Sequence, residues 1–403
     1  MLAATVRVAG DLDLAEECTQ DAYVRALETW RRDGVPDNPG GWLTTAARNR
    51  ALDSHRRAAI LRTKLALLAG DTASAPPADS ELADDDEIVD DRLRLVFTCC
   101  HPALAREAQV ALTLRLVCGL TTQEIAHSFL VGESTMAARV TRAKKKIEAA
   151  RIPYRVPAAH ELAERLDAVL TVIHLVFTAG HTASTGPHLV RAELTERALD
   201  LARTLRTLMP DERELTGLLA LMVFTTARAA TRSTPDGGFV PLEEQDRGRW
   251  DREAIEEGHH LVRAALRGGR PGRFALQGAI AGLHAEAASV ETTAWDQVVT
   301  LYDLLLRAWP SPVVALNRAV AIGFRDGPSA GLDALDAVVA AAAGDRAASA
   351  LLDGYHYLPA CRADLLRRAG RPEEARTAYR AALRLVDNDR ERAFLQRRLT
   401  GLD

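Results

Sequence analysis

Polar and basic side chains in "TTQEIAHSFLVGESTMAARVTRAKKKIEAAR", residues 121–151, have the types and spacing of a DNA-binding helix. Glu133, Thr135, Met136 and Arg139 fall in its first turns, where a recognition helix presents side chains to base edges. Ser134 is placed to cap this helix and belongs to the same candidate surface. The basic residues that follow suit phosphate contacts, namely Arg142, Lys144, Lys145 and Lys146.

Two helices and a turn must position these side chains. Thr121 or Thr122 is a suitable N-cap for the first helix, with Glu124 in its first turn. Gly132 in "VGES" is expected to turn the chain with a positive φ. We expect Thr135, Met136, Arg139 and Arg142 to project outward, and the apolar residues to face inward, namely Ile125, Ala126, Phe129, Val140 and Ile147. Such patterns also occur in all-helical cores, so this segment alone leaves both interpretations open.

A second basic segment precedes it. Residues 42–64, "WLTTAARNRALDSHRRAAILRTK", hold six Arg or Lys against Asp53, a formal charge of +5, and residues 121–151 hold six against three, giving +3. Between them, residues 71–91 carry nine acidic and no basic side chains, which predicts an extended linker. Two basic modules on either side of an acidic tether favour nucleic-acid binding over a chance basic surface.

Length, composition and apolar spacing over the whole chain indicate the fold class and the cellular compartment. It has 403 residues, a formal net charge of −4 and five scattered cysteines, with no signal-peptide pattern at its start, so we expect a cytoplasmic protein. Apolar spacings of three and four predict an all-α fold, for example Leu14, Cys18, Tyr23, Leu27 and Trp30 along one stripe. Prolines in "RIPYRVP" end the basic helix. The expected modules are 1–70, the linker 71–91, 92–152, and a helical region 158–403.

Residues 14–57 carry a more particular pattern, in which an amphipathic helix and a Pro/Gly turn precede "WLTTAARNRALDSHRR". This resembles region 2 of the extracytoplasmic-function (ECF, group 4) sigma factors of bacterial RNA polymerase, and the 92–150 module resembles sigma region 4. The resemblance implies that core RNA polymerase and promoter DNA are the partners, and that region 4 reads the −35 element. It places Asn49 in the pocket for a flipped base of the −10 element, where an amide suits an unstacked base edge. The residues implied at the −10 element are Arg48, Asn49, Arg50, Asp53, Arg56 and Arg57.

The same resemblance assigns the helix 14–32 to the polymerase clamp, with Glu17, Asp21 and Arg25 on its exposed side. A solvated helix face would have the same appearance. Trp42 is expected to be a core aromatic that joins the two region 2 helices. Only "MLAATVRVAGDLDL" precedes the clamp-binding segment, which is shorter than is usual in the family.

The C-terminal region, with "RPGRFALQGAIAGLHAEAA" and the "DGGF" loop (Asp236, Gly237, Gly238, Phe239), resembles the sigma subgroup with a tetratricopeptide-like extension (ECF42). This implies regulation in cis through intramolecular contact with the sigma modules. Paired helices joined by turns at Gly327 and Gly370, with small residues at their contacts (Ala319, Ala321, Ala375, Ala378), indicate degenerate repeats. Either a concave peptide-binding surface or a domain that covers region 4 fits this pattern. The loop is expected to dock on the sigma modules or polymerase, or else to be a plain turn before the helix at Trp250.

Other candidate sites are weak. "TCCHP" lacks a second ligand pair, so Cys99 and Cys100 are expected to be small core residues, and a Gly and a Pro interrupt the spacing of His174, His181 and His188. Nucleotide-binding and hydrolase motifs are missing from the sequence, so we expect no cofactor, no metal and no enzyme activity. Two alternatives remain: a helical scaffold with a degenerate sigma-like half, and a simple helix-turn-helix regulator.

Overall fold

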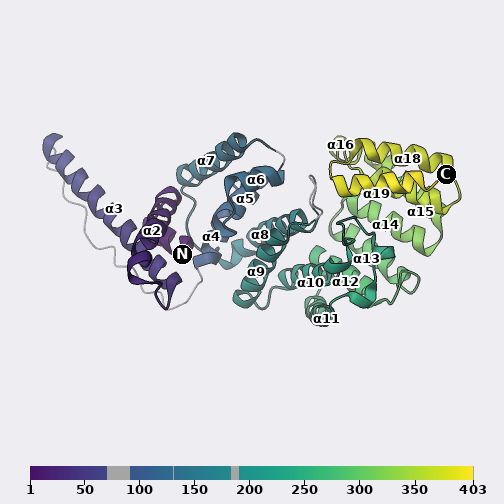
Figure 1. Ribbon diagram of the computed structural model, residues 1–403, viewed down its shortest axis with the longest axis horizontal. Helices are drawn as coiled ribbons and strands as arrows, with labels where there is room; N and C mark the ends of the chain where they lie inside the picture. The colour runs from purple at the N-terminus through teal and green to yellow at the C-terminus, as the bar shows by residue number, and fades with distance from the viewer. Residues whose placement is uncertain (70–90, 130, 183–189, 403) are drawn as a thin grey trace. The chain divides into compact units, whose positions relative to one another are not determined.

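The computed structural model describes residues 1–69, 91–129, 131–182 and 190–402. Within these ranges the chain is helical, with one isolated antiparallel bridge between Ser233 and Phe239 (Figure 1). The all-α prediction is confirmed. The predicted linker lies outside the described residues except for Asp91, which begins a helix. Within the described ranges, no helix has both the length and the apolar character needed to cross a membrane.

The chain divides into two compact units, Met1–Val172 and Ile173–Asp403. Unit 1 begins with three helices that pack on one another, because small buried residues such as Ala15, Ala22 and Ala47 allow close approach. Their bounds are α1 (Leu2–Ala9), α2 (Leu12–Asp33) and α3 (Pro39–Ala69). Asp11 caps α2 by accepting from the Leu14 amide, and Gly10, at φ 66°, makes the turn before it.

The second part of unit 1 has a core of Phe97, Leu112, Leu114, Ile125 and Met136, all fully buried. Its elements are α4 (Asp91–Cys99), α5 (Arg106–Leu112), a π-helical turn η1 (Thr113–Val117), α6 (Thr122–Phe129) and α7 (Glu133–Ala149). The first half of α8 (Ala159–His181) completes this unit. Arg165 on α8 donates to the Phe97 carbonyl, and Arg106 donates to the Ala168 carbonyl at 3.3 Å. The compact unit therefore extends beyond the predicted boundary at residue 152, to Val172.

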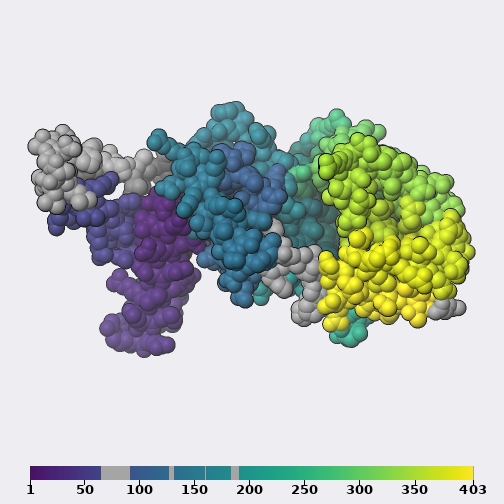
Figure 2. All heavy atoms as spheres, turned by 90° about the horizontal axis from the view of Figure 1, so that it is seen from above, coloured from purple at the N-terminus to yellow at the C-terminus, as the bar shows by residue number. Residues whose placement is uncertain are grey.

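Unit 2 is a succession of helices in which sequence neighbours pack against each other. Its helices are α9 (Ala192–Leu208), α10 (Arg213–Ala227), α11 (Arg252–Leu266), α12 (Arg273–Glu286), α13 (Trp295–Ala308), α14 (Pro312–Arg325), α15 (Pro328–Ala342), α16 (Arg346–Asp353), α17 (Tyr357–Arg368), α18 (Pro372–Leu385) and α19 (Asp389–Thr400). Short 3₁₀ turns, η2 (Ala229–Thr231), η3 (Leu242–Glu244) and η4 (Arg247–Arg249), lie between α10 and α11. Figure 2 shows the last of these helices, light green to yellow, as one closely packed mass.

Small residues set the helix spacing in unit 2. Gly217 on α10 faces the backbone of α12, where an added Cβ would stand 2.4 Å from the Ala275 nitrogen. The four predicted contact alanines are all buried, which confirms that prediction: Ala319, Ala321, Ala375 and Ala378. The turn glycines also behave as expected, since Gly327 and Gly370 have φ of 98° and 71°.

Candidate nucleic-acid interface

The α6–turn–α7 unit forms a helix-turn-helix, and Thr121 begins it as predicted. Its hydroxyl accepts from the Glu124 amide at 3.2 Å, and the Glu124 carboxylate accepts from the Thr121 amide at 2.6 Å. This reciprocal capping box satisfies two backbone donors at the start of α6 and lowers the pKa of Glu124. Ile125 and Ala126 are buried, while the side chain of Phe129 lies outside the described residues.

The turn differs from the prediction at two positions. Gly132 has a φ of −63° and is the N-cap of α7, so the expectation of a positive φ was wrong. Ser134 was expected to cap α7 but lies inside its first turn, because the helix already begins at Glu133. The Ser134 side chain is exposed and remains on the candidate surface.

The two faces of α7 are clearly separated. Its buried stripe is Met136, Val140, Ala143 and Ile147, at spacings of four, three and four residues. Met136 has no exposed surface, so its assignment as an outward-facing base reader was wrong. The exposed face carries most of the predicted side chains together with three that sequence reasoning missed: Glu133, Ser134, Thr135, Ala137, Ala138, Thr141, Arg142, Lys145 and Lys146. Arg139 is half-buried beside them.

Lys144 has a different environment from the other basic residues of α7. Its ammonium group lies 2.6 Å from Asp13 Oδ1 and also contacts Glu16, both on α2. Arg115 Nη2 lies 3.2 Å from Glu16 as well. Burial opposes the charged form, yet hydrogen bonds to the two carboxylates outweigh it and raise the pKa of Lys144. In this arrangement Lys144 is paired with carboxylates, so it is not on the exposed basic face where it was predicted.

Other contacts also join the two parts of unit 1. The Tyr154 hydroxyl is within hydrogen-bond distance of two main-chain oxygens, Ala3 at 2.7 Å and Asp91 at 3.0 Å. Arg7 lies 3.4 Å from the Asp91 carboxylate. Sequence reasoning missed these contacts because their partners are far apart in the chain.

The candidate residues on α3 lie along its exposed side. Asn49, Asp53, Arg56 and Arg57 are exposed, and Arg48 is half-buried. Arg50 lies 2.7 Å from Asp21 on α2, and Asp53 lies 3.4 Å from Arg56. The exposed amide and the pair Arg56–Arg57 therefore present a hydrogen-bonding group and two cations to solvent on one helix, which an unstacked base and its backbone phosphates require.

Trp42 packs as expected. Its ring meets Trp30 edge-to-face at 5.5 Å, which joins α2 to α3 and confirms the prediction of a core aromatic. The predicted apolar stripe on α2 was wrong at Tyr23 and Leu27, which are 52% and 64% exposed. Small residues fill the buried stripe instead, because α2 packs closely on its neighbours: Ala15, Cys18, Ala22 and Ala26.

The exposed side of α2 carries a row of large apolar side chains. Tyr23, Val24 and Leu27 form this exposed apolar row, with Glu17 and Arg25 also exposed and Asp21 paired with Arg50. Exposed apolar side chains that lie together in this way are a feature of protein-binding surfaces. The acidic and basic residues singled out from the sequence flank it.

The loop Asp236–Phe239 lies in unit 2 and contacts α19. Gly237 has a φ of 82°, and Arg390 on α19 donates to the Asp236 carbonyl at 2.9 Å. The Phe239 ring meets Phe394 edge-to-face at 5.2 Å. The tight turn is confirmed, and docking of this loop on the sigma modules or polymerase stays a prediction.

Of the residues set aside from the sequence, the two adjacent cysteines lie in a core. Cys99 and Cys100 are fully buried, as predicted, and burial raises the pKa of Cys100 to about 11. His174 packs against Phe274, and Arg232 donates to His181. His188 lies outside the described residues.

Comparison with known protein families agrees with this geometry. A profile described as sigma-70 region 2 matches residues 2–60, which span α1, α2 and most of α3. A profile described as sigma-70 region 4 matches residues 94–147, which include the helix-turn-helix. A family of unknown function (DUF6596) matches residues 165–266.

The chain is also similar to individual proteins. An uncharacterized protein (R00370) of Rhizobium meliloti is 42% identical over 405 residues, covering 100% of this chain and 93% of that protein. The probable ECF RNA polymerase sigma factor SigI of Mycobacterium tuberculosis is 30% identical over 166 residues, covering 40% of this chain and 54% of that protein. No solved structure matches the chain.

Proposed function

The chain belongs to the extracytoplasmic-function sigma factors, in the subgroup with a C-terminal helical extension, and from this we propose that it directs core RNA polymerase to specific promoters. In this proposal the exposed side of α3 captures the melted −10 element. The exposed side of α7 reads the −35 element in duplex DNA. The observation that carries the proposal is the pair of exposed basic faces on separate helices, with Asn49 on the first and Thr135 on the second.

The division of labour follows from the side chains. Asn49 is suited to an unstacked base edge, and Arg56 and Arg57 to the phosphates beside it. On α7, Glu133 and Thr135 lie in the first helical turn, which enters the major groove in this motif. Arg142, Lys145 and Lys146 follow at the positions that meet the backbone.

The exposed apolar row of α2 is the proposed contact with core polymerase. Burial of large exposed apolar residues in an interface is favourable, and aromatic side chains such as Tyr23 are common at the centres of interfaces. Glu17 and Arg25 lie beside the row and would set the orientation of the partner through charge.

Run-off transcription tests the proposal. Purified core polymerase and this protein are combined on DNA from upstream of its own gene, with Asn49→Ala and Arg142→Ala as variants. Ala58→Ser on α3, at the opposite side of the helix from Asn49, and Arg203→Ala on α9 are the controls, since both sites are exposed and outside the proposed contacts. We expect a discrete transcript that each variant reduces at least tenfold and the controls leave unchanged. Equal transcription by the variants and the controls would contradict the proposal.

We also propose that unit 2 regulates initiation in cis. A deletion variant tests this, and the packing of α8 fixes where to cut: after Val172, because Arg165 and Ala168 contact α4 and α5. Circular dichroism must first verify that the shortened chain is helical. Changed promoter output from a folded shortened chain is the expected result, and unchanged output would count against regulation by unit 2.

A further inference from the structure

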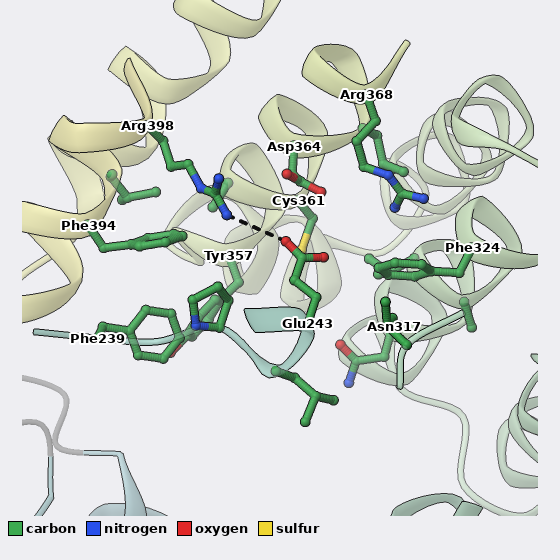
Figure 3. A pocket seen from close by; sticks show the side chains of 18 of the residues that line it. Phe239, Glu243, Asn317, Phe324, Tyr357, Cys361, Asp364, Arg368, Phe394 and Arg398 are labelled. Atoms are coloured by element: carbon green, nitrogen blue, oxygen red, sulfur yellow. Dashed lines mark ion pairs between the residues drawn. The ribbon is translucent and has the colours of Figure 1, made fainter. Parts of the chain in front are cut away.

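Unit 2 contains a cavity of about 350 Å³ whose lining is largely apolar and includes several aromatic rings (Figure 3). Phe239 and Phe394 line one side, and Phe324 and Trp295 stack on each other at 4.4 Å on another. This volume lies within the range of small-molecule sites, roughly 300–1,000 Å³. We call it the ring cavity.

A second cavity of about 320 Å³ adjoins the ring cavity. Four side chains line both spaces: Leu242, His284, Tyr302 and Asn317. Residues of α10, α12, α13 and α14 and Trp250 form the rest of the second cavity's wall, and Arg228 is the charged residue in its lining. We call it the arginine cavity. Its described lining contains no Asp or Glu.

Arg228 has no counter-charge. Within the described part of the chain its guanidinium makes no hydrogen bond, and no carboxylate lies within 4 Å. Burial lowers its pKa to about 10, and the neighbouring charge of Arg247 adds to this. Arg228 is therefore still a cation at neutral pH, and it is half-buried without a carboxylate partner, which is a costly state.

The same cavity holds further unused hydrogen-bonding groups. Gln277 Nε2 and His284 Nδ1 are buried without a partner among the described residues. Burial, Arg228 and Arg247 together lower the pKa of His284 to about 4, so its ring is neutral at pH 7. A neutral imidazole beside two arginines indicates a positive electrostatic potential in this space.

A purely structural role accounts for only part of this arrangement. Arg228 directly follows the last residue of α10, where the helix dipole favours a cation. That dipole amounts to about half an elementary charge, so it does not neutralise the guanidinium. Nor does it satisfy the amide of Gln277, which lies on a different helix.

The ring cavity is less suited to an anion. Glu243, Asp364 and Glu391 line it, and Arg398 lies 3.5 Å from Glu243 (Figure 3). Its charges are thus largely paired among themselves, whereas its rings offer apolar contact area. The arginine cavity therefore suits the anionic end of an amphipathic ligand, and the ring cavity suits its apolar end.

We propose that unit 2 binds a small organic carboxylate, with the carboxylate in the arginine cavity and the apolar body in the ring cavity. Arg228 pairs with the carboxylate, and Gln277 and Asn317 donate to it. Bound anions of this kind are held by charge-assisted hydrogen bonds, which are stronger than neutral ones. The ring walls fit either an alkyl chain or an aromatic body.

The site also includes the loop Asp236–Phe239, since Phe239 forms part of the ring cavity wall. A ligand in this cavity would contact Phe239 directly and would stabilise its packing on Phe394. The binding proposal does not rest on promoter recognition, so it is tested by binding alone.

Isothermal titration calorimetry on the full chain is the first test, with decanoate and hydrocinnamate as alkyl and aromatic probes. The uncharged analogues decanol and hydrocinnamyl alcohol have the same bodies without the carboxylate. We expect at least one acid to bind about ten- to a hundredfold more tightly than its alcohol, the range of a hydrogen bond to a charged group. No binding by either acid, or equal binding of acid and alcohol, would overturn the proposal.

Variants locate the site. Arg228→Gln is expected to weaken acid binding at least tenfold and to leave the weak binding of the alcohol unchanged. Arg203→Gln is the matched control, because Arg203 is an exposed arginine on α9, paired with Glu257 at 3.3 Å and outside both cavities. Acid binding that is the same in Arg228→Gln and Arg203→Gln would overturn the proposal.

Thermal unfolding provides a second readout. Arg228→Met removes an unpaired charge at similar volume, so the unliganded variant should melt at or above the temperature of the parent chain. The acid that raises the melting temperature of the parent should have no effect on this variant. A lower melting temperature without ligand would instead identify Arg228 as a structural residue and overturn the proposal.

Discussion

The Lys144 ammonium group on α7 lies 2.6 Å from the Asp13 carboxylate on α2. A residue of the helix-turn-helix is thus bound to the first turn of the helix that carries the exposed apolar row. Carboxylates and DNA phosphates are both anions, so either can form an ion pair with the Lys144 ammonium group. The group cannot pair fully with both at once. Under the proposed function, the carboxylates of region 2 would therefore compete with DNA phosphates for this cation of region 4.

Glu16→Gln should strengthen binding to duplex DNA. The carboxylate of Glu16 contacts both Lys144 and Arg115, so its loss leaves Lys144 paired with Asp13 alone and removes this carboxylate from Arg115. Both cations are then more available to phosphates. We expect affinity to rise about two- to fivefold at low salt, the range of partly exposed ion pairs. Fluorescence anisotropy measures it. Glu28→Gln on the same helix removes an equal charge from an exposed site, and identical affinities for the two variants would refute the competition.

Leu27→Glu should impair binding to core polymerase. Leu27 is 64% exposed in the apolar row of α2, so a charge there costs little in the free protein. In a protein interface it would be buried, and we expect at least about tenfold weaker binding. Affinity by biolayer interferometry is compared with that of Val35→Glu, which places the same charge at another exposed apolar site. Normal binding by Leu27→Glu would exclude this surface as the contact.

Met136 should behave as a core residue. Met136→Ala is expected to destabilise unit 1 by about 2–5 kcal/mol, whereas Met136→Leu conserves the volume and should cost less than about 1.5 kcal/mol. Met136→Leu should also leave −35 DNA binding unchanged. Urea unfolding and anisotropy measure the two effects. A Met136→Leu chain that is stable but fails to bind DNA would restore the base-reading role.

Gly237→Ala should weaken the turn that holds Phe239. At a φ of 82° an L side chain is strained, and its Cβ would stand 3.1 Å from the Arg390 guanidinium. We expect a loss of about 1–2 kcal/mol in the free energy of unfolding. Gly344→Ala is the control, since its nearest neighbour lies 3.9 Å away and its φ is not in the left-handed region. An equal free energy of unfolding for the two variants would contradict the prediction that an alanine at position 237 is strained.

Unit 2 should lose stability as the pH falls from about 6.5 towards 4. Burial, with the charge of Arg273, lowers the pKa of His174 to about 4, so below pH 6.5 the unfolded chain binds a proton that the folded chain does not. Stability from a depressed histidine pKa is present above 6.5 and is lost on acidification. His174→Phe should make the pH dependence shallower by up to about 1.4 kcal/mol per pH unit. Thermal melts over this range test it, and an equal slope in His174→Phe and the parent chain would contradict the prediction.

Local signals predicted local structure well. Thr121 and Glu124 form the capping box that their spacing indicates, and Gly370 makes the turn expected of it. Trp42 could be assigned to the core because an aromatic near a helix start, beside a second helix with its own Trp30, favours packing over exposure. These features depend on neighbours a few residues away or on one adjacent helix.

The sequence-based predictions that were wrong concern the orientation of residues around a helix and contacts with residues far away in the chain. Met136 lies in phase with Val140, Ala143 and Ile147, so the spacing could have revealed its burial. The reverse error at Tyr23 and Leu27 arose because small residues, not large ones, line the contact of α2. Lys144 could not be predicted, since its partners are separated from it by more than a hundred residues.

The Tyr154 hydroxyl contacts oxygen atoms that every amino acid supplies, the carbonyls of residues 3 and 91. Replacement of either partner side chain therefore leaves both acceptors in place. The contact through Tyr154 depends on residue type at that position alone, because the single hydroxyl proton is shared between two main-chain acceptors. Position 3 can therefore vary without loss of its acceptor, whereas Asp91 is also held by the ion pair of its carboxylate with Arg7. A single Tyr154→Phe exchange removes the contact with both carbonyls at once.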